Sequence, residues 1–311
     1  MNAYVAVTDP DWFRFLASQD GIDEVNFWQP KPWGGRFGVL ERGQPLLFKL
    51  KSPHNAIAGG GFFEHYTELP ISLAWEAFGR KNGAASFEEV RDRTARLRRD
   101  RLDPWEDYSI GCILLVEPFF WPESDWIPQP DDWGRNIVRG KGYDLRTGAG
   151  KRLWSQVEER LGPWRQLRRA AESPDDIAGG YGAPSLVPRR LGQGTFRIVV
   201  TDAYERRCAV TRERALPTLD AAHIKPFSDV TTHSVRNGLL LRSDVHRLFD
   251  RGYITVTPAH RVEASRRMKE DFNDGDNYLK LHGASIALPA DPSRRPEAEF
   301  LRWHNENAYR G

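Results

Sequence analysis

Cysteine is scarce in this chain of 311 residues, and this scarcity excludes proteins that depend on several disulfides. Cys112 and Cys208 are the two present, so a small secreted domain held by several disulfides is excluded. No apolar run approaches the ~20 residues that cross a bilayer, and no basic leader begins the sequence. We therefore expect a soluble, cytoplasmic protein without a membrane partner.

A strong excess of charge of one sign is also lacking. The chain has 45 Lys and Arg against 43 Asp and Glu, a net charge of +2, so it is no polycation. Arginine is concentrated locally instead, with six arginines in the eleven residues 91–101. Such a stripe suits contact with phosphates. Acidic residues are interspersed among these arginines, which is typical of a solvent-exposed helix face. A phosphate-binding stripe and an exposed helix face both stay open.

The length predicts two domains, each able to bury a core. The segment Glu172–Gly194 is rich in Gly, Pro, Ser and Asp, a composition typical of a linker. We expect an N-terminal domain over residues 1–150, a helix and flexible linker over 151–194, and a C-terminal domain over 195–311. Pro163 is a potential break in the helix before the linker.

Three polar residues of the C-terminal part have a spacing that suits phosphodiester chemistry. His223, Asn237 and His246 follow one another at 14 and 9 residues. His223 ends an apolar run, Asn237 precedes a Leu-rich strand, and His246 lies on a short helix over 243–252. This order of strand, loop, strand and helix can bring two imidazoles together while an amide fixes the loop. A single-metal phosphodiesterase needs such a site.

The same stretch resembles the HNH endonuclease family and its ββα-metal finger, over roughly residues 195–265. The segments that match are Ala222-His223-Ile224 with Pro226, Asn237-Gly238-Leu239-Leu240-Leu241, and Leu248-Phe249-Asp250-Arg251-Gly252. The resemblance implies that His223 is the general base, that Asn237 fixes the loop and the base by hydrogen bonds, and that His246 is a metal ligand. It also implies one divalent ion, Mg²⁺ or Mn²⁺, with Ni²⁺ or Co²⁺ as alternatives.

The sequence departs from the family at the second metal ligand. Many members have Asp or His directly before the base, where this chain has Ala222. Asp220 is the nearest substitute, although a bend at the strand end would be needed to aim it. Asp250 is the alternative, because it lies four residues after His246 on the same helix face.

Some family members also hold a structural zinc with two CxxC pairs. The matching position here reads Cys208-Ala209-Val210-Thr211, so the second thiolate is missing and no structural zinc is expected.

Strands alternate with helices in the N-terminal part. We expect strands over 3–8, 36–41, 44–51, 56–70 and 110–121, and helices over 71–83 and 87–99. Three successive glycines, Gly59-Gly60-Gly61, predict a bulge or a close approach of two backbones. The predicted class is α+β, with a β-rich curved barrel and helices followed by a ββα-metal nuclease domain.

This order of segments resembles the PUA-like superfamily and its EVE-type members, over roughly residues 1–145. The resemblance implies an aromatic pocket that holds a modified base, since a flipped base must regain stacking on protein faces. Trp28 and Trp33, in a Pro- and Gly-rich loop, are the first candidates. The others are Phe62, Phe63, Tyr66 and Trp121. The alternative is that most of these aromatic side chains belong to the core.

Together the two resemblances predict a modification-dependent restriction endonuclease. It would flip 5-methyl- or 5-hydroxymethylcytosine out of double-stranded DNA and hydrolyse nearby phosphodiester bonds. One HNH finger cuts one strand, so a double-strand break would need a homodimer or two nicks. Two alternatives remain: an HNH nicking nuclease that reads unmodified sequence or RNA, and a non-catalytic reader of modified nucleic acid.

Overall fold

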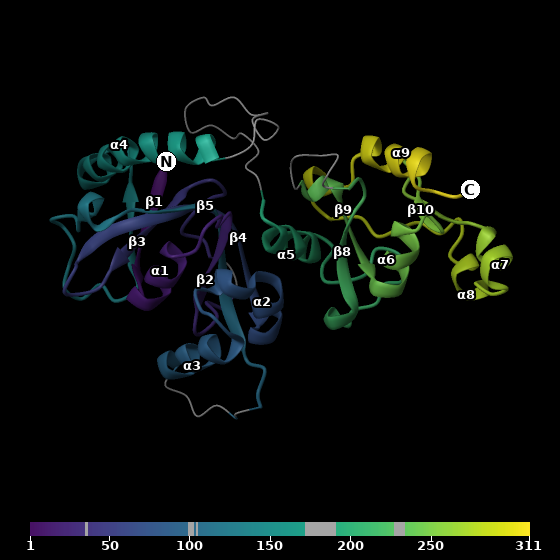
Figure 1. Ribbon diagram of the computed structural model, residues 1–311, viewed down its shortest axis with the longest axis horizontal. Helices are drawn as coiled ribbons and strands as arrows, with labels where there is room; N and C mark the ends of the chain where they lie inside the picture. Colours follow the sequence, from purple (N-terminus) through teal and green to yellow (C-terminus); the bar gives the residue numbers. More distant parts are fainter. Residues whose placement is uncertain (35–36, 99–102, 104, 172–190, 227–233) are drawn as a thin grey trace. The chain divides into compact units, whose positions relative to one another are not determined.

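The computed structural model of the protein describes residues 1–34, 37–98, 103, 105–171, 191–226 and 234–311. It contains two compact units, Met1–Thr195 and Phe196–Gly311. Both combine helices and strands (Figure 1), which confirms the predicted α+β class. Residues 172–190 of the predicted linker lie outside the described part. No helix of the described residues is long and apolar enough to cross a membrane.

The first unit is built on one mixed sheet of seven strands. These are β1 (Asn2–Thr8), β2 (Glu24–Gln29), β3 (Pro45–Leu50), β4 (Ala56–Pro70), β5 (Ser109–Phe120), β6 (Ile127–Pro128) and β7 (Gly140–Asp144). The order is β2-β5-β4-β3-β1-β7, with β6 paired to β4, and only β1 and β3 pair in parallel. Among the described residues no pairing joins β2 to β7, so the sheet is open where a barrel was predicted.

The three glycines of β4 allow its neighbours to approach closely. A Cβ atom at Gly59 would lie 2.2 Å from the Phe119 oxygen of β5, and one at Gly60 would lie 2.7 Å from the Leu46 oxygen of β3. The β4–β5 register also shifts between Gly60 and Phe62. Both the bulge and the close approach predicted from these glycines are therefore confirmed.

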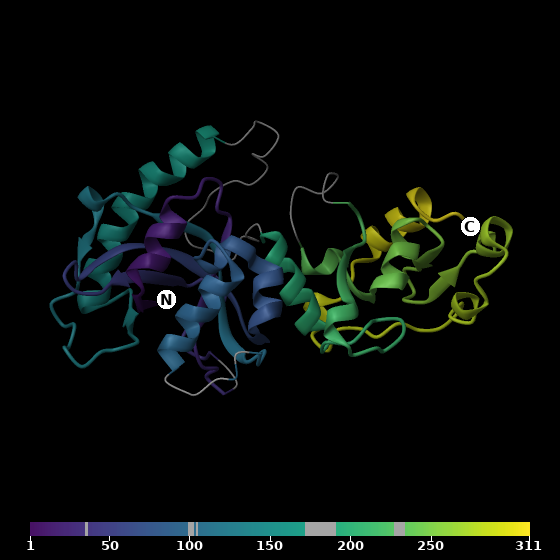
Figure 2. The ribbon, with the colours of Figure 1, turned by 60° about the horizontal axis from the view of Figure 1, so that its bottom comes forward.

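Among the described residues four α-helices accompany this sheet: α1 (Pro10–Ala17), α2 (Ile71–Phe78), α3 (Phe87–Arg98) and α4 (Gly148–Ala171). Helix α4 packs beside β7 and continues through Pro163, so the predicted break is wrong (Figure 2). Leu153, Val157 and Leu161 are buried at helical spacing. Their burial outweighs the cost of about 3 kcal/mol of an interior proline.

The second unit contains the two predicted strands and the predicted helix, while residues 227–233 of the loop between the strands lie outside the described part. Its elements are α5 (Gln193–Ala203, which begins just before the unit), β8 (Leu219–His223), β9 (Gly238–Arg242), α6 (Ser243–Asp250), β10 (Ile254–Val256), β11 (Val262–Ala264), α7 (Arg267–Phe272), α8 (Asp276–Leu279) and α9 (Ala298–Asn307). Strands β8 and β9 form a hairpin, and β10 and β11 form a second one. Helices α5 and α6 lie on opposite sides of the first hairpin (Figure 1).

Cys208 fastens the start of this finger to the hairpin without a second thiolate. Its buried sulfur accepts the backbone N–H of Thr211 at 3.3 Å and that of Arg242 at 3.2 Å. The Ala209 N–H donates to the Leu240 oxygen at 2.7 Å. These hydrogen bonds hold the start of the finger against β9.

Candidate active site

The register of the β8–β9 hairpin determines which side chains share a face. His223 pairs with Gly238, and Asp220 pairs with Leu241. Because successive residues of a strand point to opposite faces, Asp220 and Ala222 share one face and His223 lies on the other. The candidate base and the candidate metal ligands therefore approach the end of the strand from different sides.

Helix α6 covers the face of Asp220. His246 Nδ1 lies 3.4 Å from Asp220 Oδ2, and His246 Nε2 lies 3.4 Å from Asp250 Oδ2. Ala222 is fully buried on the same face as Asp220, so Asp220 reaches His246 without the bend expected from the sequence. The structure thus brings the helix histidine and both candidate carboxylates together.

The electrostatics of this group favour a cation. Partial burial raises the pKa of the Asp250 carboxyl; His246 opposes the rise and the nearby Asp220 adds to it. Two ligands of one small divalent ion lie about 3.0 to 3.5 Å apart when each bond is about 2.1 Å long. Each nitrogen–oxygen pair of His246 fits that spacing. Within the described residues no three His, Cys, Asp or Glu side chains are arranged to hold a metal ion, so the protein offers these donors in pairs.

Helix α5 covers the face of His223. The Phe196 ring stacks on the His223 imidazole, with centroids 4.0 Å apart and planes 10° apart. A Cβ at Gly238 would lie 2.6 Å from Val200 Cγ2 and 3.1 Å from Phe196 Cζ, so glycine lets α5 approach the strand end. Phe196 was not identified from the sequence. Its one signal there is its place in an apolar helix ahead of the finger.

Asn237 holds the backbone that follows His223. Its buried amide oxygen accepts the Lys225 N–H at 2.9 Å, and its amide nitrogen donates to the Lys225 oxygen at 2.8 Å. The Ile224 N–H donates to the Asn237 backbone oxygen at 2.9 Å. Three hydrogen bonds thus tie the turn after His223 to the start of β9.

Polar contacts at both ends orient helix α6. At its start Arg242 donates two hydrogen bonds of 2.7 Å to Asp244, and the Tyr278 hydroxyl donates a third at 3.0 Å. The Arg242 guanidinium and these contacts lower the pKa of Asp244 to about 2. Near its end the His304 ring stacks on Phe249 at 3.7 Å, and His304 Nε2 donates to the Phe249 oxygen at 3.1 Å.

The six candidate base-binding aromatics do not form one pocket. Trp28 lies in β2 and not in a loop; its ring is buried and its indole N–H donates to the Asn82 oxygen at 2.9 Å. Phe62 and Trp121 are buried against Phe119, with ring centroids 6.1 and 5.0 Å away. These three side chains belong to the core, so their assignment to a pocket is corrected.

The other three candidates meet around Phe37. The Phe37 ring lies 5.1 Å from Trp33, 5.5 Å from Phe63 and 6.0 Å from Tyr66. The Tyr66 hydroxyl accepts the Trp33 backbone N–H at 2.9 Å and donates to Glu68. Phe37 was missed because its segment was predicted as a strand, whereas residues 38–39 form a turn and Phe37 is buried. Phe63 is also buried, but Trp33 and Tyr66 are half-exposed.

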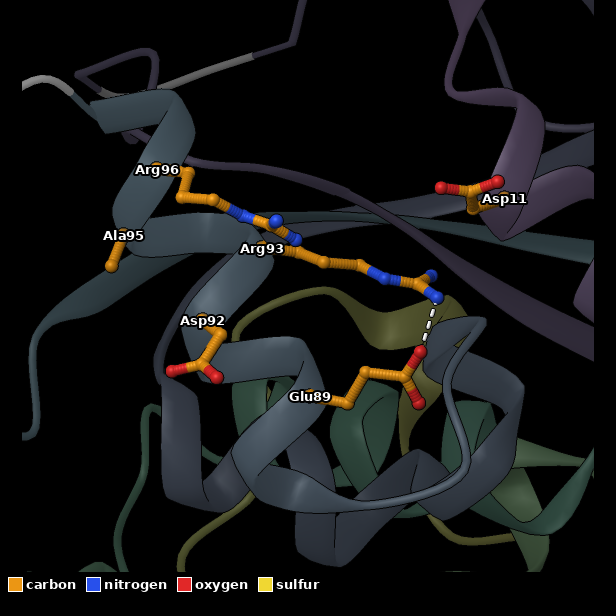
Figure 3. Close-up of a pocket in the computed structure, with 6 residues that line it drawn as sticks. All are labelled: Asp11, Glu89, Asp92, Arg93, Ala95 and Arg96. Carbon is orange, nitrogen blue, oxygen red and sulfur yellow. Dashed lines mark hydrogen bonds and ion pairs between the residues drawn. The ribbon is translucent and has the colours of Figure 1, made fainter.

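The arginines of α3 are largely engaged within the protein. Arg91 donates to the Glu106 oxygen at 2.9 Å, and Arg98 donates to the Pro30 and Ser109 oxygens. Arg93 pairs with Glu89 on the wall of a shallow hollow of about 440 Å³ (Figure 3). Asp11, Asp92 and Arg96 also line this hollow, so its charges are mixed. Arg99 and Arg101 of the predicted stripe lie outside the described residues. For Arg91, Arg93 and Arg98 the contacts favour a structural role over a phosphate-binding one.

Residues 208–257 match the model of a family described as HNH endonuclease. This match confirms the family resemblance predicted for the finger, and the second unit contains an HNH endonuclease segment. No curated protein sequence matches the chain.

Two solved structures are similar to parts of the chain at low sequence identity. ASCH from Zymomonas mobilis is 13% identical with a TM-score of 0.34, over 49% of this chain and 94% of that one. A structure titled modification dependent TagI restriction endonuclease is 11% identical with a TM-score of 0.30, over 86% of this chain and 62% of that one.

Proposed function

We propose that the protein is a modification-dependent DNA endonuclease, in which the second unit cuts DNA and the first unit reads a modified cytosine. The observation that supports the nuclease is the hairpin with α6, where His246 lies between Asp220 and Asp250 and Asn237 fixes the turn after His223. That geometry occurs within the segment matched to the HNH endonuclease family.

Each residue of the site has a distinct part in hydrolysis. The His223 imidazole, held against Phe196, accepts a proton from the attacking water. His246 with Asp220, or with Asp250, would hold one divalent ion, which supplies Lewis-acid stabilisation to phosphate oxygens. Phosphate oxygens and water would complete its coordination, because the described side chains offer no third donor.

The cluster around Phe37 is the proposed site for the base. Trp33 and Tyr66 are half-exposed aromatic side chains on a loop and a strand that hydrogen-bond to each other. The Trp33 Nε1 atom is buried and has no hydrogen-bond partner among the described residues. The Arg139 guanidinium lies 6.0 Å above the Trp33 ring. A flipped base can regain stacking on such a ring while polar groups meet its edge.

A cleavage panel tests the proposal. Matched plasmids carrying cytosine, 5-methylcytosine, 5-hydroxymethylcytosine or glucosylated cytosine are incubated with protein and Mg²⁺ or Mn²⁺. We expect cleavage of a modified plasmid and none of the unmodified one. His223→Ala should lower the rate by ~10²–10⁴-fold while binding is retained, because a general base contributes that much.

Each other outcome supports a different function. Equal cleavage of all plasmids indicates a nuclease that reads unmodified sequence. Binding of modified DNA without cleavage under any metal indicates a reader that does not cut.

A homodimer is proposed for double-strand cuts. Nicked circles that become linear only at higher protein concentration would support it.

A further inference from the structure

Lys225 is a cation held at a fixed place beside the candidate base. It follows His223 by two residues, and both its backbone N–H and its backbone oxygen are bound by the Asn237 amide. Its side chain is half-buried. The position of its stem relative to the base is therefore set by the same contacts that order the active-site turn.

No carboxylate of the described residues neutralises this ammonium. Lys225 Nζ lies instead 5.6 Å from the centroid of the Trp303 ring, a cation–π contact. Such contacts are weak at exposed sites and leave the outer face of the ammonium able to meet an anion. Lys269 of the same unit differs, since it pairs with Asp276 at 2.7 Å.

A hollow of about 200 Å³ opens between Lys225 and helix α9. Its walls are Lys225, Glu299, Phe300, Arg302, Trp303 and Glu306. A hollow of this size holds several water molecules, which suits a phosphate group with part of its hydration. Arg302 is exposed and adds a second cation, while Glu299 and Glu306 are exposed acids.

We propose that Lys225 and Arg302 bind a backbone phosphate of the DNA next to the scissile one, with Trp303 supporting the lysine stem. This inference rests on the proposed nuclease function. A phosphate fits better than a base, because a lysine meets phosphate as a point charge and Lys225 stands within two residues of His223. Glu299 and Glu306 repel the same phosphate and limit its affinity.

The test measures DNA binding in the His223→Ala background, where no cleavage interferes. Lys225→Gln should weaken binding and reduce the slope of log K against log salt concentration by about 0.9, the value for one lost phosphate contact. Lys225→Arg should keep the slope, and the matched control Lys269→Gln should leave it unchanged. Glu306→Gln should strengthen binding at low salt, the opposite sign.

Two results would overturn the inference. One is an unchanged salt slope in folded Lys225→Gln, and the other is an equal loss in Lys269→Gln. In the His223-intact protein, Lys225→Gln should raise KM several-fold and leave kcat within a few-fold; a fall in kcat alone would also refute a binding role. Failure of the wild-type protein to bind or cut any DNA would instead refute the proposed function, so the two failures are distinguishable.

Discussion

Lowering the pH should destabilise the second unit through His304, which supports α6. The ring is buried, its Nδ1 accepts the Thr255 hydroxyl at 2.7 Å, and its Nε2 donates to the Phe249 oxygen. This arrangement uses the neutral imidazole, with one nitrogen as acceptor and the other as donor. Burial lowers the pKa of His304 from 6.5 to about 4, although the Phe249 oxygen opposes the shift.

The magnitude follows from the two pKa values. In the unfolded chain the imidazole binds a proton below about pH 6.5, and in the folded protein only below about 4. The stabilisation is therefore fully present above pH 6.5 and is lost as pH falls toward 4. A shift of about 2.5 units corresponds to about 3 kcal/mol, of which about 2 kcal/mol is lost between pH 7 and pH 5.

The assay compares the wild-type protein with His304→Gln, which stays neutral at every pH. Trp303 is the single tryptophan beyond residue 195, so its fluorine signal in 5-fluorotryptophan-labelled protein reports unfolding of this unit in urea. The free energy of unfolding of the wild type should fall by about 2 kcal/mol more than that of the variant between pH 7 and pH 5. Parallel pH profiles would refute the reasoning, whatever the absolute stability of the variant.

Three further outcomes test the two sites. Asn237→Ala should destabilise the protein by about 1–3 kcal/mol in thermal unfolding and lower cleavage, because it leaves the Lys225 N–H and oxygen without these partners; unchanged stability would contradict it. His246→Ala should abolish metal-dependent cleavage, and in metal titrations Asp220→Ala should lose more activity than Asp250→Ala; full activity in both carboxylate variants would sink the ligand assignment. Trp33→Ala should reduce the ratio of binding constants for modified over unmodified DNA at one salt concentration, whereas Trp28→Phe should keep it; a wild-type ratio in Trp33→Ala would place the base elsewhere.

The finger was predictable from the sequence because its polar residues stand in register with apolar flanks. The geometry around Asp220 was not predictable, since it depends on which residues of β8 point to the same face of the hairpin. Asp220 and Ala222 lie on the same face of β8. The Asp220 carboxylate therefore reaches His246 of α6, although Ala222 at the expected ligand position has no donor atom. Counting from His223 concealed this relation, because residues three apart in a strand face opposite ways.

The aromatic cluster around Phe37 was harder to predict, because the sequence does not distinguish a loop tryptophan from a core one. Trp28 and Trp33 stand five residues apart in one aromatic and proline-rich stretch. Strand β2 is buried on both faces, so its sequence has no alternating pattern that would identify it as a strand. Trp28 therefore packs in the core, where the sequence had suggested a loop. Phe37 was not recognised because its segment has an apparent strand pattern. Phe37 and Leu40, which flank a turn and are both buried, produce this pattern.

The buried carboxylate of Glu24 bears on where the first unit ends. It accepts the N–H groups of Gly194 at 2.9 Å and Thr195 at 2.7 Å, and Lys81 Nζ lies 2.9 Å away. A Cβ at Gly192 would lie 2.1 Å from Glu24 Cδ, so glycine is needed there. A fully buried charge that loses its donors costs several kcal/mol. Residues 191–195 therefore stabilise the first unit, although they follow the end of α4 by some twenty positions. A fragment of this unit for DNA-binding experiments should extend through residue 195. A fragment that ends at residue 170 lacks Gly194 and Thr195, two of the three partners of Glu24.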